Sequence, residues 1–279
     1  GGYVKMAGML DESMDSDIKY ENDEFMVKPL WAKLWILSAG VLMNTLLAFL
    51  IFASISFYQG KGSQDFRGLN AGSDCEVAQF LKTQKIKSDI VVGHIRQANV
   101  GALTLENTHP FRRELWGRYF TFAHNGQIEG IFDQLTLGRF KPVGSTDSEH
   151  IFCWLLHEIE LAFPEPPADP KPIYDLVFRE LGKLHAQGVC NVLLTDGRVL
   201  IAYCSNRLQW ITRRAPFGSA LLKDIDLEVD FASETTVNDV VTVIATQALT
   251  TNETWESFEP NEMKVFEQGE LTFQVKATN

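Results

Sequence analysis

The feature that most limits how this chain can fold is a long stretch without a single charged residue. No Asp, Glu, Lys or Arg lies between Lys33 and Lys61, and most of the residues in between are apolar. A helix that spans a bilayer needs about 20 predominantly apolar residues. The stretch therefore predicts a transmembrane helix over 34–57, with a buried core helix as the alternative. A cleaved signal peptide is disfavoured, because an acidic and polar segment precedes the apolar residues.

Size, charge and cysteine content narrow the class of protein further. The chain has 279 residues, enough for one large domain or two small ones. Its formal net charge is −11, so we expect no nucleic-acid partner, since phosphate binding needs a basic patch. The 4 cysteines form no CxxC pair and look like cytosolic thiols rather than a disulfide framework. Because the first residue is Gly1, we expect a fragment, a processed product or an engineered chain.

After Phe57 the sequence changes to a pattern typical of a soluble protein with helices and strands. A capping box at Thr146–Glu149 predicts a helix start at Thr146. A second helix fits 173–185, and a loop fits 164–172. Strands are expected at 88–96, 118–124, 189–195, 199–205, 208–213, 239–246 and 264–273, the last folding back at Gln268–Gly269. This order of elements favours two sheets with helices outside them, an α+β arrangement.

A first resemblance is carried by Gly1–Met6, Lys28–Trp31 and Ser38–Asn44. Over about the first 56 residues these segments resemble an interior piece of the site-2-protease-like membrane metalloproteases. The HExxH zinc motif of that family is absent, and His150 and His157 are seven positions apart rather than four. Without a ligand set there is no metal-activated water, so we expect no proteolysis by that route and no metal or other cofactor.

Four short segments further along carry a second and more extensive resemblance. They are Gly93–Asn99, Glu106–Phe111, Ala123–Gln127 and Gly144–Glu149. In this order and spacing they resemble the small stand-alone bacterial class II glutamine amidotransferases, over about residues 57–274.

The second resemblance implies hydrolysis of the glutamine side-chain amide, with transfer of the ammonia to an acceptor. It also implies a four-layer αββα Ntn-hydrolase sandwich, here lacking its first strand and preceded by the apolar helix. We therefore expect three parts: a polar segment of membrane-protease type (1–33), the apolar helix (34–57) and an amidotransferase-like domain (58–279). Together the two resemblances indicate a chimera.

Two charged side chains match the family's contacts to the α-amino acid end of glutamine. Arg96 can clamp the α-carboxylate with two parallel hydrogen bonds, whereas a surface salt bridge is its structural alternative. Asp147 can hold the α-ammonium. It can also stabilise the first turn of a helix, where the dipole favours a carboxylate, and both roles can hold at once.

Asn125 and Gly126 match the family's oxyanion hole, through the Asn side chain and the Gly backbone N–H. Such donors contribute about 3–4 kcal/mol each to transition-state stabilisation. The structural alternative for an Asn-Gly pair is a type I′ hairpin turn. His94, His109 and His124 are expected to be structural, with His109 near the pocket mouth as a further substrate-binding candidate.

The nucleophile of an Ntn hydrolase is the first residue of the mature chain, and its free α-amine acts as the general base. Gly1 has no side chain that could attack, and Cys75 has no free α-amine. We therefore expect a domain that binds glutamine or a γ-glutamyl compound and is inactive as written.

The alternatives left open are a membrane-anchored binding protein without catalysis and a fragment of a membrane zinc metalloprotease. The expected partner is a small molecule, and a homo-oligomer stays open. We expect the amidotransferase-like domain to be cytoplasmic, and membrane-anchored if the helix over 34–57 forms.

Overall fold

The computed structural model describes residues 29, 88–95, 104–223, 228–233 and 235–277. The chain divides into two compact units, Gly1–Gln64 and Asp65–Asn279, and every described residue except Pro29 belongs to the second. The helix expected over 34–57 therefore lies outside the described residues, as does the membrane-protease resemblance over 1–56 except at Pro29. Within the described part, no helix has both the length and the apolar character needed to cross a membrane.

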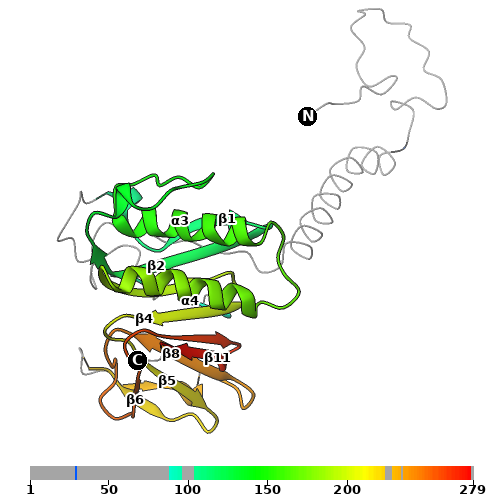
Figure 1. Ribbon diagram of the computed structural model, residues 1–279. Helices are drawn as coiled ribbons and strands as arrows, with labels where there is room; N and C mark the ends of the chain where they lie inside the picture. The colour runs from blue at the N-terminus through cyan, green and yellow to red at the C-terminus, as the bar shows by residue number, and fades with distance from the viewer. Residues whose placement is uncertain (1–28, 30–87, 96–103, 224–227, 234, 278–279) are drawn as a thin grey trace, which may run out of the picture. The chain divides into compact units, whose positions relative to one another are not determined.

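A six-stranded antiparallel sheet forms the centre of the second unit (Figure 1). Its strands lie in the spatial order β1-β2-β3-β4-β10-β11. Their bounds are β1 Phe111–Leu115, β2 Arg118–Ile128, β3 Gly188–Thr195, β4 Val199–Cys204, β10 Glu262–Glu267 and β11 Glu270–Lys276.

Two helices, α3 (Asp147–Ala162) and α4 (Lys171–His185), pack on one face of this sheet and against each other. Helix α3 begins where the capping box predicts, because the Thr146 hydroxyl accepts a hydrogen bond from the Glu149 N–H at 3.2 Å. The main hydrophobic core lies between the helices and the sheet. It includes the stacked rings of Phe122 and Phe152, whose centroids are 5.0 Å apart.

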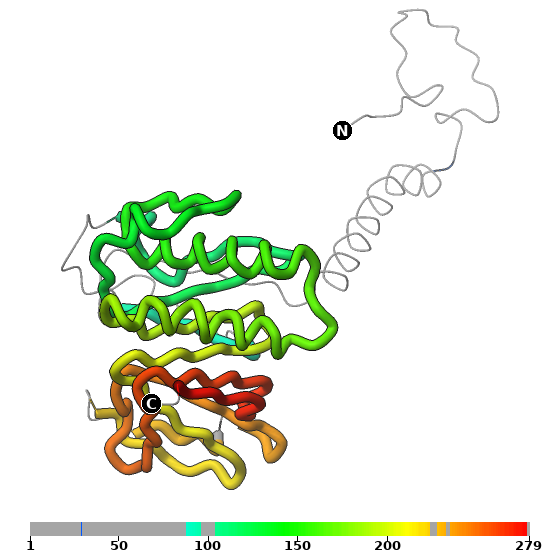
Figure 2. The backbone as a smooth tube through the Cα atoms, viewed as in Figure 1, coloured from blue at the N-terminus to red at the C-terminus, as the bar shows by residue number. Residues whose placement is uncertain are grey.

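A smaller sheet, in the order β8-β5-β9, covers the other face of the main sheet (Figure 2). Its strands are β5 Gln209–Arg214, β8 Val240–Ala245 and β9 Glu256–Ser257. Trp210 on β5 packs against Phe266 on β10, with ring centroids 5.4 Å apart, so a second core joins the two sheets. The remaining short elements are β6 Ser219–Leu221, β7 Glu228–Asp230, η2 Leu105–Asn107, η3 Ile131–Asp133 and η4 Phe231–Ser233.

Most of the elements expected from the sequence are confirmed. Strands β2, β3, β4, β5 and β8 and helix α3 lie where they were predicted, and helix α4 begins two residues early at Lys171. Pro172 is tolerated there because the first turn of a helix does not need its N–H. The expected fold-back is also confirmed. Gln268 and Gly269 have φ values of 51° and 81°, which suit a two-residue turn between antiparallel strands.

The strand expected at 88–96 is wrong for residues 88–95, which form no strand. The strand was expected because β-branched residues are common in this segment. The β propensity of such residues, however, reflects how well their side chains pack in a partly buried sheet. Val91 and Ile95 are 79% and 77% exposed, so no packed surface rewards an extended ladder. The Ser88 hydroxyl instead donates to the Ile90 carbonyl at 2.7 Å, a local bond that competes with sheet formation.

We predict that Phe152→Ala lowers the free energy of unfolding by about 3–5 kcal/mol, because it removes a fully buried ring and leaves a cavity against Phe122. Urea denaturation followed by circular dichroism measures the change. Leu161→Ala on the same helix is the matched control. Leu161 is 65% exposed and its loss should change stability by no more than about 0.5 kcal/mol. Equal effects of the two substitutions would contradict the assigned core.

Candidate functional site

Asn125 and Gly126 lie inside strand β2 and not in a turn. In the ladder between β2 and β3 they stand opposite Asn191 and Cys190, and the pairing continues to Ile128. The hairpin-turn alternative is therefore excluded. Because successive side chains of a strand point to opposite faces, the Asn125 side chain lies on the face away from α3, on which the smaller sheet packs.

Position 126 accepts only glycine. A Cβ atom there would lie 1.8 Å from the Val189 carbonyl oxygen and 2.8 Å from Nε2 of His124. Backbone and a buried ring both block the space, so any larger residue would push β2 away from β3. The close approach of Val189 and His124 therefore requires glycine at this position of the strand.

His124 connects strand β2 to the start of helix α3. Its Nε2 lies 3.2 Å from the Val189 carbonyl oxygen and its Nδ1 lies 2.9 Å from Oγ of Ser148. A carbonyl can only accept, so Nε2 donates to the Val189 carbonyl oxygen. The Ser148 hydroxyl lies within hydrogen-bond distance of both Nδ1 of His124 and Oδ1 of Asp147, at 3.2 Å from the latter. Burial lowers the pKa of His124, and the nearby Asp147 charge and the Val189 carbonyl oppose this shift only in part.

Asp147, the first residue of α3, binds the edge of β2 directly. One carboxylate oxygen accepts the Ile128 N–H at 2.9 Å, and the other accepts the Ser148 N–H at 2.8 Å. The carboxylate is only partly buried. It therefore keeps acceptor capacity on a side that a ligand can reach, while two N–H groups hold its orientation.

The N–H groups of Gly126 and Ile128 point to the same edge of β2. The Cys190 N–H donates to Oγ of Ser205, which follows β4, at 2.8 Å, so it points away from β2. In an antiparallel ladder this makes Gly126 and Cys190 a pair that exchanges no backbone hydrogen bonds. The Gly126 N–H consequently points away from β3, as does that of Ile128, which reaches Asp147.

The segment Glu106–Phe111 is joined to the loop before α3. Oδ1 of the buried Asn107 accepts the Ser145 N–H at 2.8 Å, and its Nδ2 lies 3.3 Å from the Ser145 hydroxyl oxygen. Gly144 allows this close approach, because a Cβ atom there would lie 2.3 Å from Oδ1 of Asn107. This contact brings the second and fourth of the sequence segments together.

His109 joins the first segment to the second. Its buried ring lies between those of His94 and Phe111, with centroids 4.1 Å and 4.5 Å away. Together with the contact between His124 and Ser148, these contacts connect all four segments singled out in the sequence. Arg96 lies two positions beyond His94 and outside the described residues, so its place as the carboxylate clamp stays a prediction, and so does any role of Cys75.

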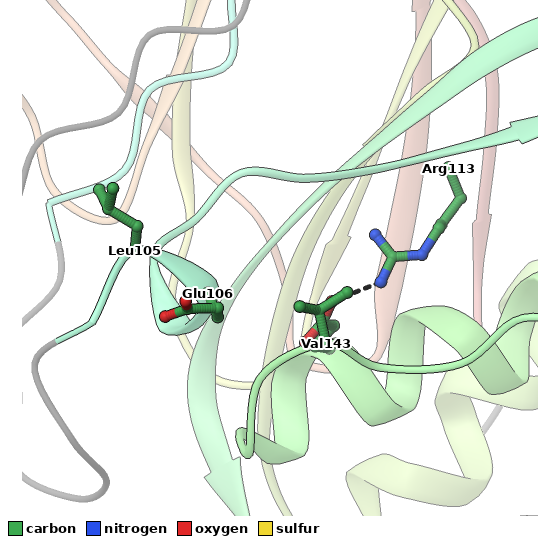
Figure 3. Close-up of a pocket in the computed structure, with 5 residues that line it drawn as sticks. Leu105, Glu106, Arg113 and Val143 are labelled. Carbon is green, nitrogen blue, oxygen red and sulfur yellow. Dashed lines mark hydrogen bonds and ion pairs between the residues drawn. The ribbon is translucent and has the colours of Figure 1, made fainter.

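A small pocket of about 290 Å³ lies beside the four connected segments, on the side of β1 (Figure 3). It is lined by Leu105, Glu106, Arg113, Val143 and Glu149. The buried Glu149 is already satisfied, since its carboxylate binds the partly exposed Arg113 guanidinium and also accepts the Gly144 N–H at 2.7 Å. The ion pair therefore fixes the loop before α3 rather than offering a free charge to a ligand.

The described cysteines are unsuited to nucleophilic attack. Cys153, Cys190 and Cys204 are free and fully buried. Burial raises the pKa of Cys153 to about 11, of Cys190 to about 12 and of Cys204 to about 11. Only a thiolate is strongly nucleophilic, so none of the three is reactive near neutral pH. Among the described residues there is also no group of three or more His, Cys, Asp or Glu placed to hold a metal.

Two residues with important contacts were missed at the level of the sequence. Ser148 lies within the segment Gly144–Glu149, but its bond to His124 depends on the packing of α3 on β2. Asn191 is a buried amide in an otherwise apolar strand. A polar residue in such a strand must find hydrogen-bond partners, and that signal could have identified it.

We predict that His124 makes stability depend on pH. Its folded pKa lies below the unfolded value of about 6.5, so below that pH the unfolded chain binds a proton that the folded chain does not. Its contribution is therefore complete above about pH 6.5 and is lost as the pH falls towards the folded pKa. Denaturant titrations at about pH 7.5 and 5.5 should show a smaller loss of stability on acidification for His124→Gln than for the unchanged chain. An identical loss in both would contradict the neutral, buried ring.

Comparison with known proteins agrees with the connected segments. The model of the family described as glutamine amidotransferases class-II matches residues 54–279. YafJ of Escherichia coli (strain K12), a predicted glutamine amidotransferase, is 52% identical over 216 residues, which are 77% of this chain and 84% of YafJ. A protein of Haemophilus influenzae with the same predicted activity is 37% identical over 224 residues, which are 80% of this chain and 76% of the relative.

A solved structure is similar as well. The crystal structure at 2.0 Å of a predicted glutamine amidotransferase from Pseudomonas aeruginosa PA01 has a TM-score of 0.58 and 51% sequence identity, and the match covers 64% of this chain and 69% of that one. These matches support the second resemblance, whereas the membrane-protease resemblance and the chimera stay predictions from the sequence.

Proposed function

Because this chain belongs to the class II glutamine amidotransferase family and has its α+β Ntn-hydrolase-like fold, we propose that it binds glutamine or a γ-glutamyl compound along the edge of β2 to which the N–H groups of Gly126 and Ile128 point. The reaction is hydrolysis of the side-chain amide, in which glutamine and water give glutamate and ammonia. The small-molecule substrate follows from the family, and the acceptor of the ammonia is left open.

The observation that carries this proposal is the shared edge of Asp147 and the Gly126 N–H. Residues two apart in a strand repeat every 6.6 Å or so, which is about the distance between the N–H groups of Gly126 and Ile128. The five bonds from the α-nitrogen of glutamine to its side-chain oxygen span about 6 Å when extended. An ammonium near Asp147 therefore leaves the amide oxygen near Gly126.

Each group at this edge has a chemical role in the proposal. Asp147 accepts hydrogen bonds from the α-ammonium, and Arg96 clamps the α-carboxylate. The Gly126 N–H and the Asn125 amide donate to the oxygen as it gains negative charge in the tetrahedral transition state. His109 lies against His94 near the same segments, where it can contribute to the wall of the substrate pocket.

The nucleophile comes from outside the described residues, because all three described cysteines are buried and protonated. In the reaction of the Ntn type, an N-terminal cysteine attacks the amide carbon while its α-amine takes the thiol proton. The edge described above supplies substrate binding and oxyanion stabilisation, which are separate from the attacking group.

We predict that a polypeptide with the printed sequence releases no ammonia from glutamine, because it offers no cysteine with a free α-amine. A version in which residues 1–56 are replaced by an N-terminal segment of the stand-alone type, processed to begin with Cys, should hydrolyse glutamine. An enzyme-coupled ammonia assay on both chains measures this, with Gly126→Ala in the second chain as an inactive control. Turnover by the printed chain that survives Cys75→Ala would contradict the assigned chemistry, and a folded but inactive second chain would contradict the proposed function.

We predict that Asp147→Asn weakens glutamine binding to the full chain by about 10–100-fold, since a hydrogen bond to a charged group contributes about 1.5–3 kcal/mol. Glutaric acid monoamide lacks the α-ammonium, so its affinity should fall by less than about threefold and separate loss of the charge contact from local disturbance. Titration calorimetry measures both ligands, and Asp133→Asn, at an exposed carboxylate in η3, is the control. Equal losses for the two ligands would remove Asp147 from its proposed role.

We also propose that the chain is anchored in a membrane through residues 34–57. This proposal rests on the uncharged stretch between Lys33 and Lys61. Partition of the full chain into detergent or membranes tests it, and a full chain that stays in solution without detergent would contradict it.

A further inference from the structure

We infer that Asn191 is a positioning residue that orients and strengthens the Gly126 N–H as an oxyanion donor. This inference rests on the proposed function for its catalytic consequence. Its structural basis is a hydrogen bond from Nδ2 of Asn191 to the carbonyl oxygen of Asn125, at 3.0 Å.

The Asn125 carbonyl and the Gly126 N–H belong to one peptide unit. In a planar trans peptide the C=O and N–H bonds point in opposite directions. In the register with β3 the Asn125 carbonyl points to the Asn191 backbone N–H, and the Nδ2 donor adds a second bond to the same oxygen. Holding the carbonyl on this side holds the N–H toward the edge where Asp147 lies. Hydrogen bonds in series also polarise each other, so a donor on the carbonyl makes the N–H a stronger donor in turn.

Hydrogen bonds hold the Asn191 side chain so that Nδ2 can donate to the Asn125 carbonyl oxygen. It is 2% exposed, and its Oδ1 accepts N–H groups from the chain that follows β4, at 3.0 Å from Ser205 and 3.3 Å from Asn206. Its second Nδ2 hydrogen goes to Oδ1 of Asn206 at 2.8 Å. With its oxygen occupied by N–H donors, the amide cannot flip, and Nδ2 must face Asn125.

The surroundings explain why an amide is needed. The Asn191 side chain must accept from the backbone on one side and donate to a backbone carbonyl on the other. Aspartate and leucine, which have a similar size, fail one or both of these tasks. Aspartate keeps the acceptor but presents a second oxygen to the Asn125 carbonyl, and leucine supplies neither group.

The test compares Asn191→Asp and Asn191→Leu with Asn206→Ala. The last substitution removes the second Nδ2 partner and leaves the bond to Asn125 and the backbone N–H of Asn206 in place. Measurements at about pH 8 favour the ionised form of an introduced carboxyl. Thermal unfolding of each variant verifies that it folds, and Asn191→Asp retains the bonds from Ser205 and Asn206 if Asn191→Leu does not fold.

The first readout is the backbone amide resonance of Gly126 in the full chain, from heteronuclear NMR. Both substitutions of Asn191 should shift the Gly126 amide, whereas Asn206→Ala should leave it in place. A Gly126 resonance that does not respond to Asn191→Asp, or that responds equally to Asn206→Ala, would overturn the inference. This readout requires no turnover.

The second readout is glutaminase kinetics in the version that begins with Cys. Asn191→Asp should lower kcat by about tenfold or more with KM nearly unchanged, because the oxyanion exists only in the transition state. Asn206→Ala should stay within about twofold, well below the loss of an oxyanion donor. A rise in KM alone would overturn the positioning role. If the unsubstituted version shows no turnover, the proposed function fails and the resonance of Gly126 decides the inference alone.

Discussion

The hydrogen bond from the Ile128 N–H to the Asp147 carboxylate is the contact on which the arrangement of the site depends. It joins the exposed edge of a strand to the first residue of a helix, and both partners belong to elements with large buried faces. A carboxylate at a helix N-terminus is also stabilised by the helix dipole. The same contact satisfies an N–H that the sheet leaves unpaired where β1 ends. In the proposed function, structure and ligand binding thus use this one side chain at the same time.

Neighbouring contacts hold this helix start in place. Thr146 caps the helix, Glu149 binds both Arg113 and the loop at Gly144, and Ser148 binds His124. Glu149 is buried whereas Arg113 is partly exposed, so loss of Arg113 would leave a buried carboxylate without its guanidinium partner. The pair of Arg113 and Glu149 therefore specifies one geometry of the loop. The proposed binding of a small amino acid requires such a fixed geometry.

Whether a feature of the fold or the site could be predicted from the sequence depends on how far apart in the chain the interacting residues lie. Helix α3 follows from its capping box and β2, β3 and β4 from their apolar residues, because these signals are local. The segment 88–95 shows the limit, since its β-branched residues find no surface to pack on and form no strand. The four segments were grouped by resemblance, and no local pattern could reveal that Asn107 meets Ser145 or that His124 meets Ser148. Those contacts exist only because the helix packs on the sheet.

The Asn125–Gly126 pair illustrates how an identical dipeptide takes different structures in different surroundings. In isolation Asn-Gly favours a tight turn, since both residues tolerate positive φ. Here the ladder with β3 holds it extended, and Gly126 is required for another reason: the Val189 carbonyl and the His124 ring occupy the space of a side chain. The ladder register with β3 turns the Gly126 N–H outward, toward the edge shared with Asp147. This N–H is therefore oriented by the sheet before any ligand binds, and as the proposed oxyanion donor it needs no reorganisation when charge develops on the amide oxygen.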